Sequence, residues 1–119
     1  MENSRNKLYS LDNLEEISGG STDFIRQMLE MFMEQAEKTV TGFSEGIAKS
    51  DYKLIRDLAH QIKPSIDNLI IDQLKELIRK VESEAEKESE EQDLKPLILE
   101  TNSHLETVIS QLKIELEGM

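Results

Sequence analysis

Several residue types are scarce or missing in this chain of 119 residues, which contains no cysteine and no tryptophan, only two prolines and only five glycines. Without cysteine, the chain has no disulfide framework, no thiolate metal site and no cysteine nucleophile. With so little glycine and proline, it lacks the turn residues on which a β-sandwich depends. Because 33% of the residues are charged, the composition is typical of a soluble helical protein.

Long apolar runs are missing as well. None approaches the roughly 20 residues that a membrane-spanning helix needs, and the N-terminal residues lack the hydrophobic region of a signal peptide. The sequence therefore predicts a cytoplasmic protein without a membrane partner. The formal net charge of −11 also argues against nucleic acid or an anionic membrane surface, because both are negatively charged.

Apolar residues recur at helical spacing through most of the chain. They predict helices over about 22–48, 51–69, 72–85 and from 93 to near the end, with a shorter helix over about 8–17. Amphipathic helices with short connections favour an all-α fold, an antiparallel up-down-up-down four-helix bundle with a short additional N-terminal helix. We expect one domain over 1–119, with the bundle at about 22–117.

Small polar residues at the expected helix starts predict N-caps. The candidates, in chain order, are Ser10, Ser21 or Thr22, Ser50 or Asp51, Asp72 and Asp93. Pro96 would then fall in the first turn of the last helix, where its missing donor matters least. Gly42 and Gly46 each weaken a helix by about 1 kcal/mol relative to alanine, so we expect bending or fraying there.

The helix over 51–69 has one apolar arc and one polar face. His60 lies roughly 160° from the centre of the arc at 100° per residue, so its side chain is expected to point into solvent. An exposed histidine on a helix commonly has no role. Here, however, it is surrounded on the polar face by Lys53, Arg56, Asp57, Lys63, Pro64 and Asp67.

Basic residues gather around this histidine in an otherwise acidic chain. Residues 49–63 contain four cations and two carboxylates, a net charge of +2 against −11 for the whole chain. Chance clustering on a solvated face would explain this equally well if the histidine were ignored. Pro64 is a second unusual feature, because an interior proline costs about 3 kcal/mol or more. We expect it to kink the helix beside His60 without ending it.

Other candidate sites are weaker. The methionines Met28, Met31 and Met33 would suit an adaptable binding groove, but we expect Met28 and Met31 to fill the core, with Met33 at its edge. His104 lies at the edge of an apolar stripe, where we expect it to have a structural role or none. The acidic segment 82–91 reads as a solvated helix end leading into a loop. It lacks the spacing of a calcium-binding loop, and we expect no metal site.

Nothing in the sequence assembles an enzyme by itself. There is no P-loop, no glycine-rich nucleotide loop and no zinc-protease motif. An exposed imidazole can nevertheless accept a phosphoryl group, because its neutral ring nitrogen is a nucleophile at neutral pH. Such a carrier needs an oriented ring and a nearby cation. Lys63, one turn after His60, would pair with phosphoryl oxygens, and Gln61 or a residue of a neighbouring helix would orient the ring.

A short motif around His60 is similar to the signature of a known protein family. It reads Ala59-His60-Gln61-Ile62-Lys63-Pro64-Ser65 and continues to Asn68-Leu69. It resembles the signature of histidine phosphotransfer (HPt) domains, in which an Ala-His pair is followed by lysine three residues later, then a small residue, then serine or alanine. Pro64 stands where that family usually has glycine, and Ile70 stands where a second glycine is common.

The resemblance implies a carrier that passes phosphoryl groups between receiver-domain aspartates in a two-component phosphorelay. His60 would be phosphorylated and Lys63 would support the added charge. The docking face would comprise Lys53, Arg56, Gln61, Pro64 and Asp67. The partner would be the receiver of a hybrid sensor kinase or a response regulator, which supplies Mg²⁺. The chain itself would be a monomer with no cofactor and no ATP-binding or phosphatase machinery.

Two alternatives stay open. One is a helical adaptor that docks on a receiver or another signalling protein without being phosphorylated. The other is a plain helical bundle with a methionine-rich peptide groove, which explains neither the His60–Lys63 spacing nor the basic cluster.

Overall fold

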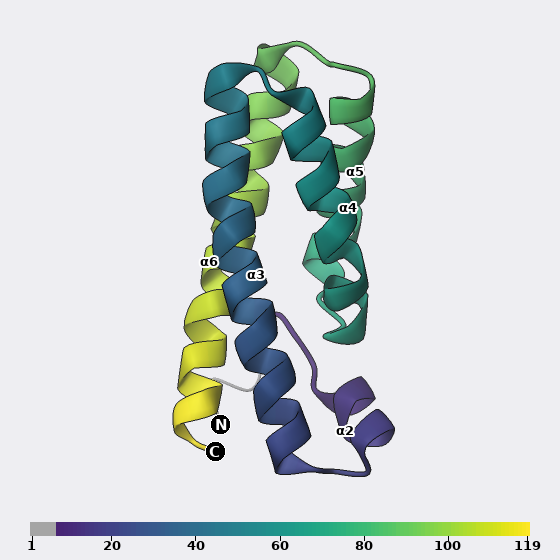
Figure 1. The fold of residues 1–119 in the computed structure, drawn as a ribbon, viewed down its shortest axis with the longest axis vertical. Coiled ribbons are helices and arrows are strands. Elements are labelled where there is room, and N and C mark those ends of the chain that lie inside the picture. Colours follow the sequence, from purple (N-terminus) through teal and green to yellow (C-terminus); the bar gives the residue numbers. More distant parts are fainter. Residues whose placement is uncertain (1–6) are drawn as a thin grey trace.

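The computed structural model describes residues 7–119, apart from the side chain of Glu91. Within this range the chain forms α-helices joined by turns and contains no strand, so the prediction of an all-α fold is confirmed (Figure 1). The helices in chain order are α2 (Asp12–Ser18), α3 (Thr22–Lys49), α4 (Tyr52–Asn68), α5 (Asp72–Glu86) and α6 (Glu91–Glu117).

The long helices α3 to α6 lie side by side along the long axis of the molecule, and the chain reverses direction at each connection between them (Figure 1). Each packs against two others, so that α3 contacts α4, α4 contacts α5, α5 contacts α6, and α6 contacts α3. The short α2 lies at one end, near the start of α3.

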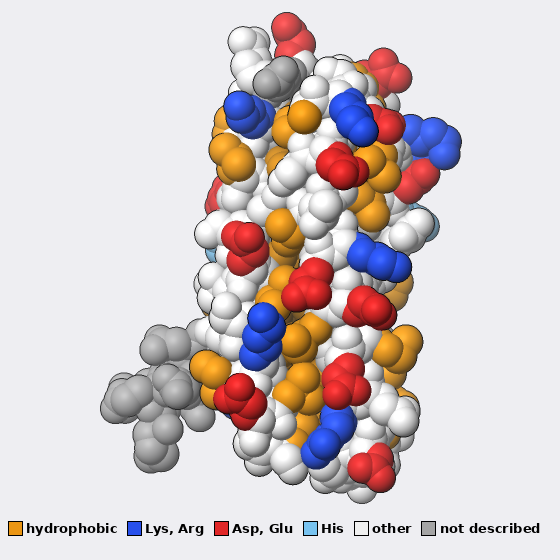
Figure 2. Space-filling view, turned by 60° about the vertical axis from the view of Figure 1, so that its left-hand side comes forward, with side chains coloured by type: hydrophobic (Ala, Val, Ile, Leu, Met, Phe, Trp, Pro, Cys, Tyr) orange, Lys and Arg blue, Asp and Glu red, His pale blue; other side chains and the backbone are white. Residues whose placement is uncertain are grey.

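The core lies between these helices and consists of their apolar stripes. Its largest fully buried side chains are Phe43, Leu29, Ile55, Ile62, Ile66, Ile71, Leu74, Ile78, Leu94, Ile98, Leu105 and Leu112. On the face drawn in Figure 2, apolar side chains form a narrow seam along the long axis, with acidic and basic side chains on both sides. The helices are thus amphipathic, as their periodicity predicts.

The first two long helices begin at predicted caps. Ser21 Oγ accepts a hydrogen bond from the Phe24 amide, and the Asp51 carboxylate accepts one from the Leu54 amide. Both contacts satisfy amide groups that have no partner within the helix.

The caps predicted for the last two helices were wrong. The helix α5 follows Ile71, whose carbonyl accepts from the Leu74 and Lys75 amides, so Asp72 already lies in the first turn. The helix α6 starts two residues before Asp93, because the Glu90 carbonyl accepts from the Asp93 and Leu94 amides. Pro96 therefore lies inside α6, beyond the first turn.

The N-terminal helix is shorter than predicted and begins at Asp12 instead of near Leu8. The preceding residues bond to other helices instead of to one another. The Leu8 amide donates to Gln111 Oε1 at 2.9 Å, and the Ser10 amide donates to the Leu69 carbonyl at 2.8 Å. These contacts hold the segment across the ends of α4 and α6.

Gly42 and Gly46 do not fray or end α3, which continues to Lys49. Both glycines are buried, and both allow α4 to approach closely. A Cβ atom at Gly42 would collide with the Leu58 side chain, and one at Gly46 would lie 2.5 Å from Ile55 Cγ1. The expected fraying was wrong because tertiary packing against α4, which helix propensity ignores, holds the last turns of α3 in place.

Candidate functional site

The helix α4 presents His60 to solvent. Its neighbours Ala59 and Ile62 are fully buried, whereas the His60 side chain is 70% exposed. The helical phase therefore places the imidazole opposite the core, as predicted. A side chain this accessible can enter the active site of another protein.

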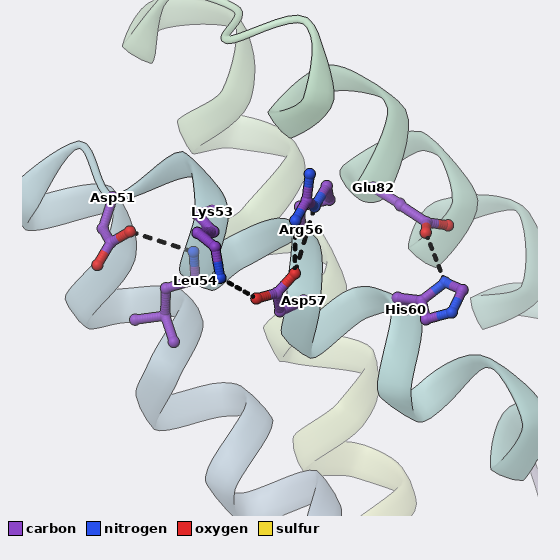
Figure 3. A network of polar contacts seen from close by, with 7 residues as sticks. All are labelled: Asp51, Lys53, Leu54, Arg56, Asp57, His60 and Glu82. Atoms are coloured by element: carbon purple, nitrogen blue, oxygen red, sulfur yellow. Dashed lines mark hydrogen bonds and ion pairs between the residues drawn. The ribbon is translucent and has the colours of Figure 1, made fainter.

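The imidazole is held by a carboxylate from the neighbouring helix. Glu82, on α5, has one carboxylate oxygen 2.9 Å from Nδ1 of His60 (Figure 3). Its other oxygen lies 2.7 Å from Nζ of Lys63. Glu82 thus bridges the two residues that the motif singles out, and its own side chain is only 19% exposed.

This contact determines which ring nitrogen is free. The hydrogen bond to Lys63, more than the one to His60, holds the pKa of the Glu82 carboxyl below its ordinary value. The carboxylate is therefore ionised near neutral pH and can only accept hydrogen bonds. In the neutral ring, Nδ1 of His60 therefore carries the hydrogen, and the lone pair is on Nε2, the nitrogen directed away from Glu82 (Figure 3).

Sequence reasoning missed Glu82 because it assigned residues 82–91 to a solvated helix end. The structure continues α5 to Glu86, and Glu82 is half-buried against α4. A signal was present, since Glu82 follows the fully buried residues Leu74 and Ile78 at intervals of four. Residues at this spacing share one face of a helix, so Glu82 had to point toward the neighbouring helices.

The predicted docking cations are paired with acids. Lys53 lies 3.1 Å and Arg56 2.9 Å from carboxylate oxygens of Asp57 (Figure 3). The Arg56 guanidinium, followed by the Lys53 ammonium, holds the pKa of the Asp57 carboxyl below its ordinary value. Both cations share this one carboxylate, whose charge is already counted in the net +2 of residues 49–63, so the cluster stays basic.

The remaining predicted site residues occupy the same stretch of α4. Asp67 pairs with Arg79 of α5 at 3.3 Å. Gln61 and Pro64 are exposed, and α4 runs through Pro64 to Asn68, as predicted. Gln61 is not what holds the ring of His60, since its recorded contact is through its backbone carbonyl, which accepts from Gln35.

A hollow of about 340 Å³ lies between α3 and α4, next to Gln61. It is lined by Met28, Met31, Phe32, Glu34, Gln35, Lys38, Gln61 and Ser65. The expectation that Met31 fills the core was wrong, because Met31 is 64% exposed. It precedes the buried Phe32 by one position and so is turned by about 100° from the core.

The second histidine lies outside this cluster. His104 is half-buried on α6, with Nδ1 3.0 Å from the Glu100 carbonyl of its own helix. This environment suits the structural role predicted for it. Among residues 7–119, no group of three or more histidine, cysteine or acidic side chains is arranged to hold a metal ion. None of the helices in this range is long and apolar enough to cross a membrane.

Comparison with known proteins identifies the family of the chain. A family model described as the Hpt domain matches residues 27–117. The chain belongs to the Hpt domain family. A comparison with curated proteins finds no match.

A solved structure has the same fold. It is the crystal structure of the HPT domain from the Hpt sensor hybrid histidine kinase from Shewanella, which is 20% identical with a TM-score of 0.80. The alignment covers 94% of this chain and 96% of that one. Membership of the family gives the chain a phosphotransfer role in a two-component phosphorelay, as a phosphoryl carrier and not as a conventional enzyme. Hpt domains interact with receiver domains of hybrid kinases and response regulators.

Proposed function

We propose that His60 is the residue that carries the phosphoryl group and that Nε2 is its nucleophilic atom. The observation that carries this proposal is the hydrogen bond between Glu82 and Nδ1 of an otherwise exposed imidazole. Fixing the hydrogen on Nδ1 keeps the lone pair on the nitrogen that a partner can reach.

In the transfer step, the Nε2 lone pair attacks the phosphorus atom of an aspartyl phosphate on a receiver. The P–O bond to the aspartate breaks, and its electron pair returns to the aspartate carboxylate. The ring, which keeps the hydrogen on Nδ1, then bears a positive charge that faces the Glu82 carboxylate. Transfer onward reverses the step, with a receiver carboxylate attacking phosphorus and the N–P electron pair returning to Nε2.

Lys63 supports the added charge in this proposal. It lies one turn after His60, and its ammonium already contacts Glu82 at 2.7 Å. A phosphoryl group on Nε2 carries nearly two negative charges at neutral pH and competes with Glu82 for this cation. The exchange of Lys63 from Glu82 to the phosphoryl oxygens would offset part of the charge brought to the site.

The proposed partner is the receiver domain of a hybrid sensor histidine kinase or of a response regulator, and the receiver supplies Mg²⁺. The proposed docking face surrounds His60 and comprises Lys53, Arg56, Gln61, Pro64 and Asp67. The carrier contributes no cofactor, ATP site or phosphatase machinery of its own. We propose that it acts as a monomer. It would act in the cytoplasm, because a relay that starts from ATP needs access to that nucleotide.

We propose that the fold around this site is an antiparallel up-down-up-down four-helix bundle with a short N-terminal helix. The bundle and the short helix would form one domain over 1–119. The order of helix contacts supports it. In such a bundle, His60 sits midway along one helix, with Glu82 supplied by the next.

The test is incubation with a phosphorylated receiver and Mg²⁺, followed by mapping of the label. We expect label on His60, loss of label in His60→Gln, and normal labelling in the matched His104→Gln variant. The label should be lost in acid and persist in base, as an N–P bond requires. A chain that binds the receiver tightly but never takes label would instead be an adaptor.

A further inference from the structure

The turn of α4 that follows His60 has an unfilled position in its hydrogen-bond ladder. In an α-helix the amide four residues after His60 would donate to the His60 carbonyl, but Pro64 at that position has no N–H. The helix nevertheless continues for another turn to Asn68. Contacts from outside the ladder can therefore stabilise this turn, and the buried Ile62 and Ile66 supply part of them through the core.

Gln35 of α3 makes that connection. Its Nε2 donates to the Gln61 carbonyl at 3.2 Å, and its Oε1 accepts from the Ser65 hydroxyl at 2.9 Å. Gln61 and Ser65 are four residues apart and flank Pro64, so a single amide group spans the weakened turn from outside. The orientation of the amide is determined, because a backbone carbonyl can receive a hydrogen bond only from the NH₂ end.

The two hydrogen bonds of Gln35 lie next to the proposed reacting group. Gln61 directly follows His60, whose ring is hydrogen-bonded to Glu82. Two contacts from different helices therefore act near the reacting nitrogen. Glu82 holds the ring from α5, and Gln35 holds the backbone beneath it from α3.

We propose that Gln35 is a positioning residue for phosphotransfer, which holds the Pro64-containing turn so that His60 is presented in one orientation. This inference rests on the proposed role of His60. It assigns Gln35 no contact with the phosphoryl group. Misplacing a reacting atom by about 1 Å can slow a reaction on the order of 100-fold, so partial loosening of this turn should give a smaller but measurable effect.

The experiment measures the rate of transfer from a phosphorylated receiver within the preformed complex, and separately the Kd of the complex. Gln35→Ala should slow the transfer step about tenfold, by partial misplacement of Nε2, while the Kd changes less than twofold. Ser65→Ala, which removes one of the two bonds with little loss of packing, should have an intermediate effect. Gln27→Ala is the matched control, since Gln27 is an exposed glutamine of the same helix.

Pro64→Ala supplies the decisive background, because alanine restores the N–H that can bond to the His60 carbonyl. If Gln35 acts through the weakened turn, Gln35→Ala should slow transfer less than twofold when residue 64 is alanine. An equal loss in both backgrounds overturns the proposal, as does a loss that appears in Kd alone. Failure of His60 labelling in the unaltered chain would contradict the proposed function instead, so the two failures are distinguishable.

Discussion

The carboxylate of Glu82 lies 2.9 Å from Nδ1 of His60, across the contact between α5 and α4. The relationship gives an exposed side chain a defined tautomer, although the imidazole is not buried. It also places a negative charge beside the ring, which would become positive if His60 is phosphorylated as proposed. The two effects should be measurable separately. Fixing the tautomer needs only a hydrogen-bond acceptor, whereas stabilising a positive ring needs a negative charge.

We expect Glu82→Gln to slow phosphotransfer less than Glu82→Ala. Glutamine still offers an oxygen to Nδ1–H, whereas alanine removes the acceptor and releases the tautomer. Loss of a group that orients an imidazole typically costs 10–100-fold in metal sites, so we expect roughly tenfold for alanine. Single-turnover transfer gives the rates, and ¹⁵N chemical shifts of the His60 ring give the tautomer. Equal rates in all three proteins would exclude Glu82 from the reaction.

Replacing Lys63 with alanine should slow transfer or shorten the lifetime of phosphorylated His60 without unfolding the domain. The Lys63 ammonium ends on Glu82, and the side chain is not part of the apolar core, so its loss should leave the core packed. Decay of acid-labile label with time measures the lifetime. Lys53→Ala is the control, because Lys53 contacts Asp57 instead of Glu82. If the label decays at the same rate in the two variants, Lys63 does not stabilise the phosphoryl group.

The helices and His60 could be predicted from the sequence because both depend on local patterns. A period near 3.6 residues marks the apolar stripes, and the same period places His60 opposite one of them. The spacing of Lys63 from His60 within one helix likewise needs no tertiary information. These features follow from the geometry of a single α-helix.

The contributions of Glu82 and Gln35 could not be predicted with certainty because they depend on how α4 packs against its neighbours. Each residue lies more than 20 positions from its partner, with separations of 22 for Glu82–His60 and 26 for Gln35–Gln61. The register between helices is set by close packing, including the glycine contacts of α3. Helix propensity alone therefore gave the wrong expectation for Gly42 and Gly46.

Those two glycines should respond differently to alanine. Alanine favours the helix by about 1 kcal/mol at either position. At Gly42 the new methyl group meets the end of Leu58, a half-buried side chain that can rotate away, so we expect little net change. At Gly46 it meets the fully buried, β-branched Ile55, and overpacking of about 1–3 kcal/mol should outweigh the gain. Urea unfolding measures the free energy of unfolding of both variants. Equal changes in the two would contradict this interpretation of the contacts.

Ile70→Gly should stabilise the domain. Ile70 has φ of 51°, a left-handed conformation that costs a residue with a side chain about 1–2 kcal/mol and suits a β-branched one poorly. The added freedom of glycine in the unfolded chain offsets part of the gain, so we expect a net increase of up to about 1 kcal/mol in the free energy of unfolding. Ser50→Gly, at φ of 53°, should gain less because serine is not β-branched. A loss of stability in Ile70→Gly would mean that the packing of Ile70 outweighs its strain.

Tyr9 should make the domain sensitive to alkaline pH. Burial and a 2.6 Å hydrogen bond to Glu115 raise the pKa of the phenol above its ordinary value of 10.0. The unfolded chain therefore loses this proton at lower pH than the folded chain does. The resulting stability is fully present below about pH 10 and is lost as the pH rises from there toward the folded-state pKa.

We therefore expect the free energy of unfolding to fall above pH 10 in the unaltered protein and to fall less steeply in Tyr9→Phe. At pH 7 the same variant should lose about 1–2 kcal/mol, because the phenol donates to a carboxylate. Urea unfolding at several pH values between 7 and 11 measures both effects. Tyr52→Phe, at the other tyrosine of the chain, is the control and should keep the steep alkaline loss. An alkaline slope unchanged by Tyr9→Phe would assign the loss to other groups, such as the lysines, and leave Tyr9 as a packing residue alone.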